Sequence, residues 1–215
     1  MKGIFILLML VLLFTCGCKS DNFWESDKLK DYHVNVDTPM QKPNAVDFIN
    51  QLNKSLGIYS LHSGFDSAQI RIWFFTGGLP SQCNLIVLKN NGEWKANYFH
   101  FILKDYIVND TAVLRDLSIR RLYPRDWSML MGALFENNIK NLPDCYNLKG
   151  YNMNVPNPDG CQIEYSDKKI YRHYTYLAPN YFDSHMLEQR QIQNIILIIS
   201  NELSLPQIKK RMLDQ

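Results

Sequence analysis

The sequence lacks the short motifs that identify the common classes of enzyme. It has no Gly-x-Ser-x-Gly turn for a serine nucleophile, no glycine-rich loop for a phosphate, and no His-Glu-x-x-His or Cys-x-x-Cys spacing for zinc. Its five histidines are scattered at spacings that suggest no pairing with a cysteine nucleophile. The sequence therefore gives no specific reason to expect catalysis, a metal ion or a cofactor.

The sequence also lacks a large excess of either charge and a long hydrophobic run. The 215 residues contain 23 Lys and Arg against 21 Asp and Glu, so no strongly basic surface argues for nucleic acid as a partner. The apolar run over residues 4–14 is shorter than the roughly 20 residues that a membrane-spanning helix needs. No linker rich in Pro, Gly or Ser and no internal repeat divides the chain after about residue 43, so residues 43–215 are expected to form one globular domain.

The amino terminus has the pattern of an export signal. Lys2 gives a positive start, the apolar run follows, and Thr15-Cys16-Gly17-Cys18 ends it. This tetrapeptide resembles the lipobox of bacterial lipoproteins, in which small residues precede a cysteine that is lipidated on sulfur and becomes the first residue of the mature chain. The resemblance implies a signal peptide over residues 1–17, a lipid on Cys18 and a polar tether over residues 18–42.

Two other interpretations of this region stay open. Lipidation of Cys16 would put Leu13 three residues before the acceptor, as is usual in the family, but would leave Thr15 beside the cleavage site. The segment is also compatible with an ordinary secretory signal or an uncleaved anchor.

The lipoprotein resemblance also implies a location, the bacterial cell envelope. A single acyl chain anchors a protein only marginally, whereas the three chains of a bacterial lipoprotein make membrane attachment effectively permanent. Lys19 follows Cys18 in place of the aspartate that retains lipoproteins in the inner membrane of some bacteria. The outer membrane is therefore favoured, and the leaflet, periplasmic or surface, stays open.

Apolar periodicity predicts an α+β domain. Its expected architecture is a mostly antiparallel sheet built from hairpins, with about three helices packed against one face of the sheet. The first helix is expected to begin at Asn44 and end at Gly57, the second to begin at Pro124, and the last to be capped by Asp183 or Ser184.

Turn signals predict two hairpins. One turns at Asn90-Asn91-Gly92, where an Asn-Gly pair supplies the positive φ angles of a tight turn, and the other turns at residues 166–169. β-rich runs predict further strands over residues 58–62, 69–75 and 113–123, with a short edge strand near residues 32–36.

Three cysteines remain beyond the lipobox. A disulfide between Cys145 and Cys161 would close an irregular loop of about 15 residues and add on the order of 3 kcal/mol of stability in the chain-entropy model. The alternative is that Cys83, Cys145 and Cys161 are all reduced and buried as small apolar residues.

Aromatic residues are concentrated in the two hairpins. Alternation places Trp94 and Tyr98 on one face of the first hairpin, and Tyr174 and Tyr176 on one face of the second. These four residues are candidates for an exposed platform that binds a sugar or a peptide. The alternative is that they pair across the sheet or pack beneath a helix.

These observations favour a function in binding over one in catalysis. The expected protein is a lipid-anchored envelope module that binds a carbohydrate, a peptide or another envelope protein, or supports an assembly. The alternative is a lipid-anchored hydrolase whose scattered site residues form no sequence motif.

Overall fold

The computed structural model describes residues 35–37, 44–62, 64–76, 82–103, 113–151, 155, 158–180 and 186–214. The predicted signal peptide, the lipobox and Cys18 lie outside these residues, so the predictions made for them stay predictions. Asp183 and Ser184 also lie outside them.

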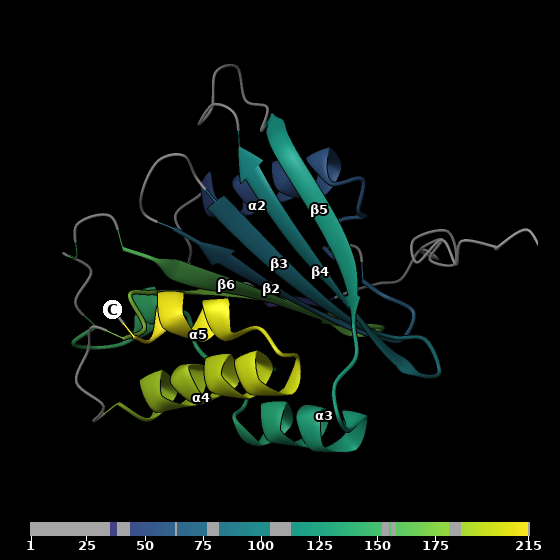
Figure 1. Cartoon of the computed structure of the whole chain (residues 1–215). Helices are drawn as coiled ribbons and strands as arrows, with labels where there is room; N and C mark the ends of the chain where they lie inside the picture. The colour runs from purple at the N-terminus through teal and green to yellow at the C-terminus, as the bar shows by residue number, and fades with distance from the viewer. Residues whose placement is uncertain are drawn as a thin grey trace, which may run out of the picture.

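The described residues contain one seven-stranded sheet, in the order β1-β7-β6-β2-β3-β4-β5 (Figure 1). β1 pairs with β7 in parallel, and every other neighbouring pair is antiparallel. This confirms the predicted α+β fold with a mostly antiparallel sheet. The strands are β1 (Asn35–Asp37), β2 (Ala68–Phe75), β3 (Gln82–Asn90), β4 (Trp94–Leu103), β5 (Leu114–Leu122), β6 (Gly160–Asp167) and β7 (Ile170–Leu177).

Both predicted hairpins are present. β3 and β4 pair from Asn90 opposite Trp94, and Gly92 in the connecting turn has φ +88°, which favours glycine. The Asn90 side chain accepts a hydrogen bond from the Gly92 amide at 3.1 Å and fixes the turn. β6 and β7 turn at Asp167. Its carboxylate accepts hydrogen bonds from the backbone amides of Lys169 and Ile170.

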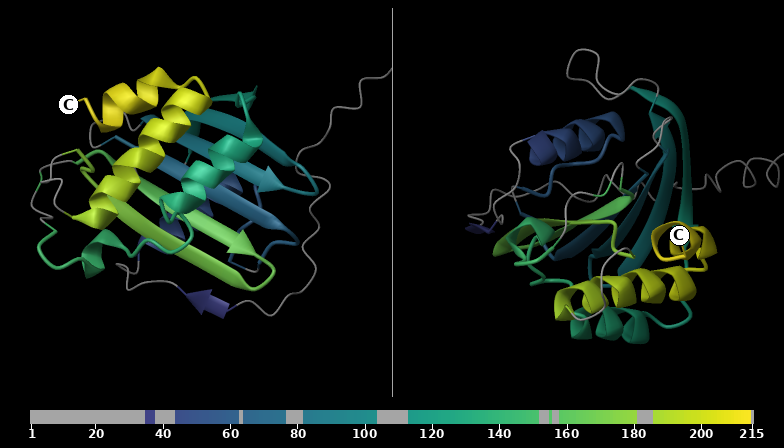
Figure 2. Two further views of the ribbon diagram at one scale, coloured as in Figure 1. Left: turned by 90° about the horizontal axis from the view of Figure 1, so that it is seen from below. Right: turned by 90° about the vertical axis from the view of Figure 1, so that its left-hand side faces the viewer.

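Helices cover both faces of the sheet (Figure 2). α2 (Asn44–Ser55) lies on one face, whereas α3 (Trp127–Glu136), α4 (Leu187–Glu202) and α5 (Pro206–Met212) lie on the other. We call these the α2 face and the α4 face. The expectation of helices on one face only was wrong, because nearly every position of β2 and β3 is buried and both sides of those strands need cover.

Each face has its own hydrophobic core. On the α2 face, α2 packs against side chains of β2, β3 and β4, represented by Trp73, Leu85 and Phe99. On the α4 face a larger core joins the three other helices to all the central strands, represented by Ile72 and Tyr174. Alternation along each strand therefore assigns a side chain to one core or the other.

Three helices end in the same kind of turn. α2 ends with Gly57 at φ +67°, and the amide of Ile58 bonds to the carbonyl of Asn53 at 2.9 Å. α3 and α4 end similarly, with Asn138 and Ser204 at the positive-φ position. This is the Schellman arrangement, and it satisfies carbonyls that the helix end would leave unpaired.

Several predicted boundaries need correction. α3 begins at Trp127 with Asp126 as its side-chain cap, not at Pro124. The cap residue of α4 is Met186, which makes no side-chain capping hydrogen bond, and not Asp183 or Ser184. Residues 58–62 form no strand but an irregular segment. β1 falls inside the predicted tether, so part of that tether belongs to the sheet, in agreement with the expected short edge strand.

Candidate functional site

The four aromatic residues predicted as a binding platform do not form one. Tyr174 and Tyr176 are completely buried in the core of the α4 face, with their rings 6.1 Å apart in an edge-to-face arrangement. Tyr98 is 6% exposed, and Trp94 packs against the same core. Alternation had grouped these residues on one face correctly, but α3, α4 and α5 cover that face.

The three described cysteines are buried, and none of them forms a disulfide. The predicted disulfide between Cys145 and Cys161 is therefore not part of this structure, although the two belong to the same core. Burial raises the pKa of Cys145 to about 12, with a smaller contribution from the Asp144 carboxylate, and burial also raises the pKa of Cys83 to about 12. Burial raises the pKa of Cys161 further still. Such thiols are poor nucleophiles near neutral pH.

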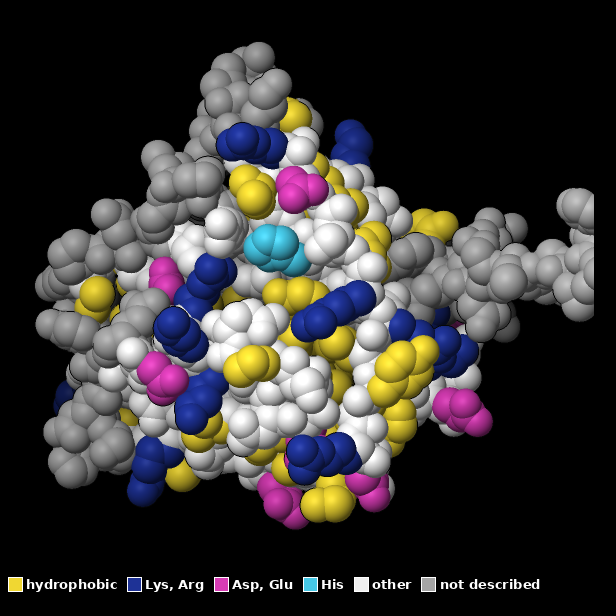
Figure 3. Space-filling view, in the orientation of Figure 1, with side chains coloured by type: hydrophobic (Ala, Val, Ile, Leu, Met, Phe, Trp, Pro, Cys, Tyr) yellow, Lys and Arg dark blue, Asp and Glu magenta, His cyan; other side chains and the backbone are white. Residues whose placement is uncertain are grey.

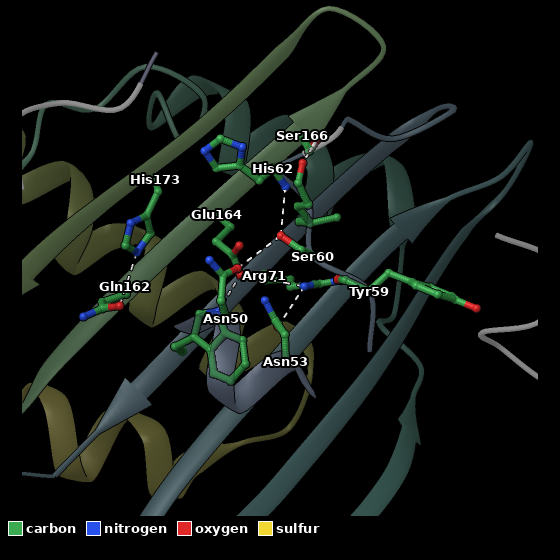
Figure 4. Close-up of polar contacts among 12 residues, drawn as sticks. Asn50, Asn53, Tyr59, Ser60, His62, Arg71, Gln162, Glu164, Ser166 and His173 are labelled. Carbon is green, nitrogen blue, oxygen red and sulfur yellow. Dashed lines mark hydrogen bonds and ion pairs between the residues drawn. The ribbon is translucent and has the colours of Figure 1, made fainter. Parts of the chain in front are cut away.

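A buried ion pair lies beneath the carboxyl end of α2 (Figure 4). Arg71 of β2 and Glu164 of β6 face each other with 3.9 Å between nitrogen and oxygen, and each side chain is 1% exposed. Arg71 also donates to the Asn53 side chain at 2.9 Å and to the Tyr59 carbonyl at 2.6 Å. The guanidinium thus ties the sheet both to α2 and to the segment that follows it.

The Glu164 carboxylate is held by two further donors from neighbouring strands. The indole nitrogen of Trp73 donates to one oxygen at 2.8 Å, and the Tyr171 hydroxyl donates to the other at 3.1 Å. Both oxygens of the buried carboxylate therefore have a hydrogen-bond donor, as burial of such a group requires. These contacts indicate a structural role for the network, which connects β2, β6 and β7 with α2.

His173 extends the same buried polar layer along β7. Its Nε2 lies 3.2 Å from the Gln162 side-chain oxygen, and Figure 4 shows the pair beside Glu164. Burial lowers the pKa of His173, and the nearby Glu164 charge opposes that effect only in part. Because the imidazole is buried, it is stable in its neutral form.

A hollow of about 410 Å³ lies next to this network, between α2 and the segment that follows it. Ser60 donates to the Asn50 side chain at 3.1 Å inside it. Figure 4 shows the Tyr59 side chain extending away from the ion pair, and 52% of it is exposed. The hollow is open to solvent on one side, whereas the charges beneath it are not accessible.

A second polar cluster lies on the α4 face. The Asn84 side-chain oxygen accepts hydrogen bonds from the Tyr98 hydroxyl at 2.6 Å and from His100 Nδ1 at 2.9 Å. Because an amide oxygen only accepts, Nδ1 of His100 is the donor in this contact. Arg120 lies over the Tyr98 ring at 5.0 Å. Unlike the ion pair, this cluster includes a half-buried histidine and an exposed arginine.

Strand β5 forms an open edge of the sheet. Every residue from 115 to 121 is exposed, including the apolar Leu117 at 38% and Ile119 at 52%. No described strand pairs with its outer side. Figure 3 views the molecule from this side and shows dark-blue basic side chains spread among apolar ones. An edge with free backbone donors and acceptors is a template for a further strand.

The opposite edge of the sheet, at β7, is closed. β1 pairs with residues 170–172, and farther along the Asp144 carboxylate accepts a hydrogen bond from the Thr175 amide at 2.9 Å. A short strand and a side chain thus take up polar groups on the outer side of β7.

The sequence interpretation missed the ion pair, the Asn84 cluster and the open edge. Arg71 stands alone among apolar residues in a predicted strand, and an isolated charge there was an available signal for a buried partner. The charged and apolar residues of β5 follow no clean alternation, which is typical of a strand exposed on both faces.

The described residues include no group of three or more side chains suited to a metal ion. None of their helices combines the length and apolar character needed to cross a membrane. Comparison of the chain with family models, with curated proteins and with solved structures finds no match.

Proposed function

We propose that this chain is a lipid-anchored protein of the bacterial cell envelope that supports an assembly by adding an extended protein segment to strand β5. The lipobox-like sequence supports lipidation at Cys18, and Lys19 supports the outer membrane as its location. The open β5 edge is the observation that favours a protein partner over a carbohydrate.

Strand addition fits the chemistry of this edge. Main-chain hydrogen bonds supply affinity in strand addition, and side chains at alternate positions supply specificity. β5 offers Leu117 and Ile119 on the α2 face, and Asp116, Ser118 and Arg120 on the α4 face, as their partners in β4 show. An apolar pair on one face and charges on the other select both the register and the direction of an incoming strand.

Anchoring is tested on the full chain extracted from membranes. Intact-mass and amino-terminal peptide analysis should give a chain that begins at triacylated Cys18, and Cys18→Ser should lose processing or membrane attachment. An unmodified Cys18 within a chain that begins elsewhere would contradict the proposed anchor.

The binding edge is tested by site-specific photo-cross-linking in native membranes. A photoreactive residue in place of Ile119 should give a protein adduct, identified by mass spectrometry. The matched control is Leu187 at the start of α4, which is apolar and 56% exposed and should give none. Equal adduct yields at the two positions, or none at Ile119, would contradict the proposed function.

A second candidate function, a lipid-anchored hydrolase, is favoured by one row of residues on the α4 face. Asn84, His100 and Ser118 lie opposite one another across β3, β4 and β5. Asn84 orients the imidazole, and Ser118 is an exposed hydroxyl beside it. A fluorophosphonate reagent would label an activated serine in the intact protein, and Ser118→Ala would abolish that label. An unlabelled wild-type protein would reject this candidate.

A further inference from the structure

The exposed part of β5 is complementary to itself. In Asp116-Leu117-Ser118-Ile119-Arg120, apolar residues flank the central serine, and charges of opposite sign stand at the two ends. An antiparallel copy of this segment centred on Ser118 therefore places unlike charges opposite each other and apolar residues opposite apolar residues. Cross-strand pairs of these kinds stabilise antiparallel sheets.

The fold keeps these pairs on matching faces. Leu117 and Ile119 stand opposite Phe101 and Phe99 of β4 and so lie on the α2 face. Asp116 and Arg120 lie on the α4 face. A twofold axis perpendicular to the sheet preserves the faces, so two copies would form a four-residue apolar cluster on one side and two ion pairs on the other.

Arg115 and Arg121 are the one unfavourable pair in this register, because like charges would face each other. The pairing of β4 with β5 passes from Asp116 opposite Ile102 to Leu114 opposite Leu103, so Arg115 is the extra residue of a bulge. A bulged residue is not held in the ladder, and Arg121 has an alternative contact with the Tyr123 ring at 5.4 Å. The complementary register thus ends where the bulge begins.

We infer that the segment added to β5 is β5 of a second copy of this chain, paired antiparallel about Ser118 to join two sheets into one. This inference rests on the proposed function, and it names the partner at the same edge. The pairing involves one short strand from each copy, so it is weak in dilute solution. Attachment to one membrane raises the effective concentration of the copies and favours pairing there.

A cysteine on the twofold axis tests the register directly. In an antiparallel pair, directly opposed residues are close enough for a disulfide, so full-length Ser118→Cys should cross-link to a dimer when membranes are mildly oxidised. Arg125→Cys, exposed just beyond β5, is the matched control and should stay monomeric. The native thiols at positions 83, 145 and 161 are buried and do not compete.

Charge exchange then tests the pairing. In the Ser118→Cys background, Asp116→Arg or Arg120→Asp places like charges opposite each other at two positions, and each should lower the yield of dimer about tenfold. The double exchange should restore the yield, and so should co-expression of the two single variants, which pair only with each other. Arg125→Asp makes the same charge change as Arg120→Asp outside the register and should have no effect.

The outcomes separate this inference from the proposed function. No Ser118→Cys dimer above the Arg125→Cys control, or a yield that the charge exchanges leave unchanged, would overturn the inference. If that result came with an adduct to a different protein at Ile119, the binding edge would stand and only the identity of its partner would be wrong. If Ile119 also gave no adduct, both would fail.

Discussion

The two edges of the sheet differ in how their backbone polar groups are used. At the β7 edge, the short parallel strand β1 and the Asp144 carboxylate occupy backbone groups on the outer side of the strand. At β5, seven consecutive residues are exposed, and no described strand pairs with their outer side. An exposed edge is an aggregation hazard that proteins usually blunt. The contrast between the two edges supports the proposal that β5 binds a partner.

The buried polar groups follow the same division. The Arg71–Glu164 pair, its donors and His173 all lie on strands β2, β6 and β7, in the half of the sheet that ends at the closed edge. The half that ends at β5 has its polar cluster around Asn84, with the half-buried His100 in it. Substitutions in the first half should therefore affect stability, and those at the β5 edge should affect association.

The largest effect is expected from breaking the buried ion pair. Glu164→Gln leaves the Arg71 guanidinium buried without its counter-charge and should lower the free energy of unfolding by about 3 kcal/mol in urea titrations. Adding Arg71→Met to that variant should recover part of the loss, because the unpaired charge is then gone. A Glu164→Gln protein as stable as the wild type would contradict the structural role of the ion pair.

A smaller loss is expected from opening the β7 edge. Asp144 is completely buried and accepts hydrogen bonds from the amides of Tyr146 and Thr175, each at 2.9 Å. Asp144→Ala leaves both amides without this acceptor and should lower the free energy of unfolding by about 2 kcal/mol. The matched control is Asp116→Ala on β5, which should change it by less than about 0.5 kcal/mol. Equal losses of unfolding free energy in the two variants would contradict the different roles assigned to the two edges.

The pH dependence of stability tests the structural role of the buried polar groups in the half of the sheet that ends at β7. Burial lowers the pKa of His173 in the folded state, so below its ordinary value of 6.5 the unfolded chain binds a proton that the folded chain does not. Stability should therefore fall as the pH drops below 6.5, and His173→Gln should lack this part of the fall. Urea titrations at about pH 7.5 and about pH 5 measure the difference. Parallel pH profiles for the two proteins would contradict it.

The smallest effect on stability is expected at the open edge. Ile119→Thr keeps a β-branched side chain at a site that is 52% exposed, so the free energy of unfolding in dilute detergent should change by less than about 0.5 kcal/mol. The same substitution should reduce the yield of Ser118→Cys dimer in membranes. A large loss of stability with unchanged cross-linking would reverse the roles assigned to the two edges.

Local signals in the sequence were enough for the hairpins, because Asn90-Asn91-Gly92 and Asp167 determine their turns without help from distant residues. They were not enough for the sheet order. Trp73 and Glu164 meet although 91 residues separate them, and no short pattern encodes that contact. Alternation grouped Tyr174 with Tyr176 correctly, but it cannot tell which face of a sheet the helices will cover.

Amide hydrogen exchange over residues 116–120 tests the central claim most directly, because it reports on the backbone groups that a new strand would engage. The full-length protein is measured twice, in native-like membranes at high surface density and in dilute detergent. We predict slow exchange of the outward-facing β5 amides in membranes and fast exchange in dilute detergent, with residues 170–177 equally protected in both. Fast exchange of the β5 amides in both conditions would contradict the claim that β5 is a binding edge.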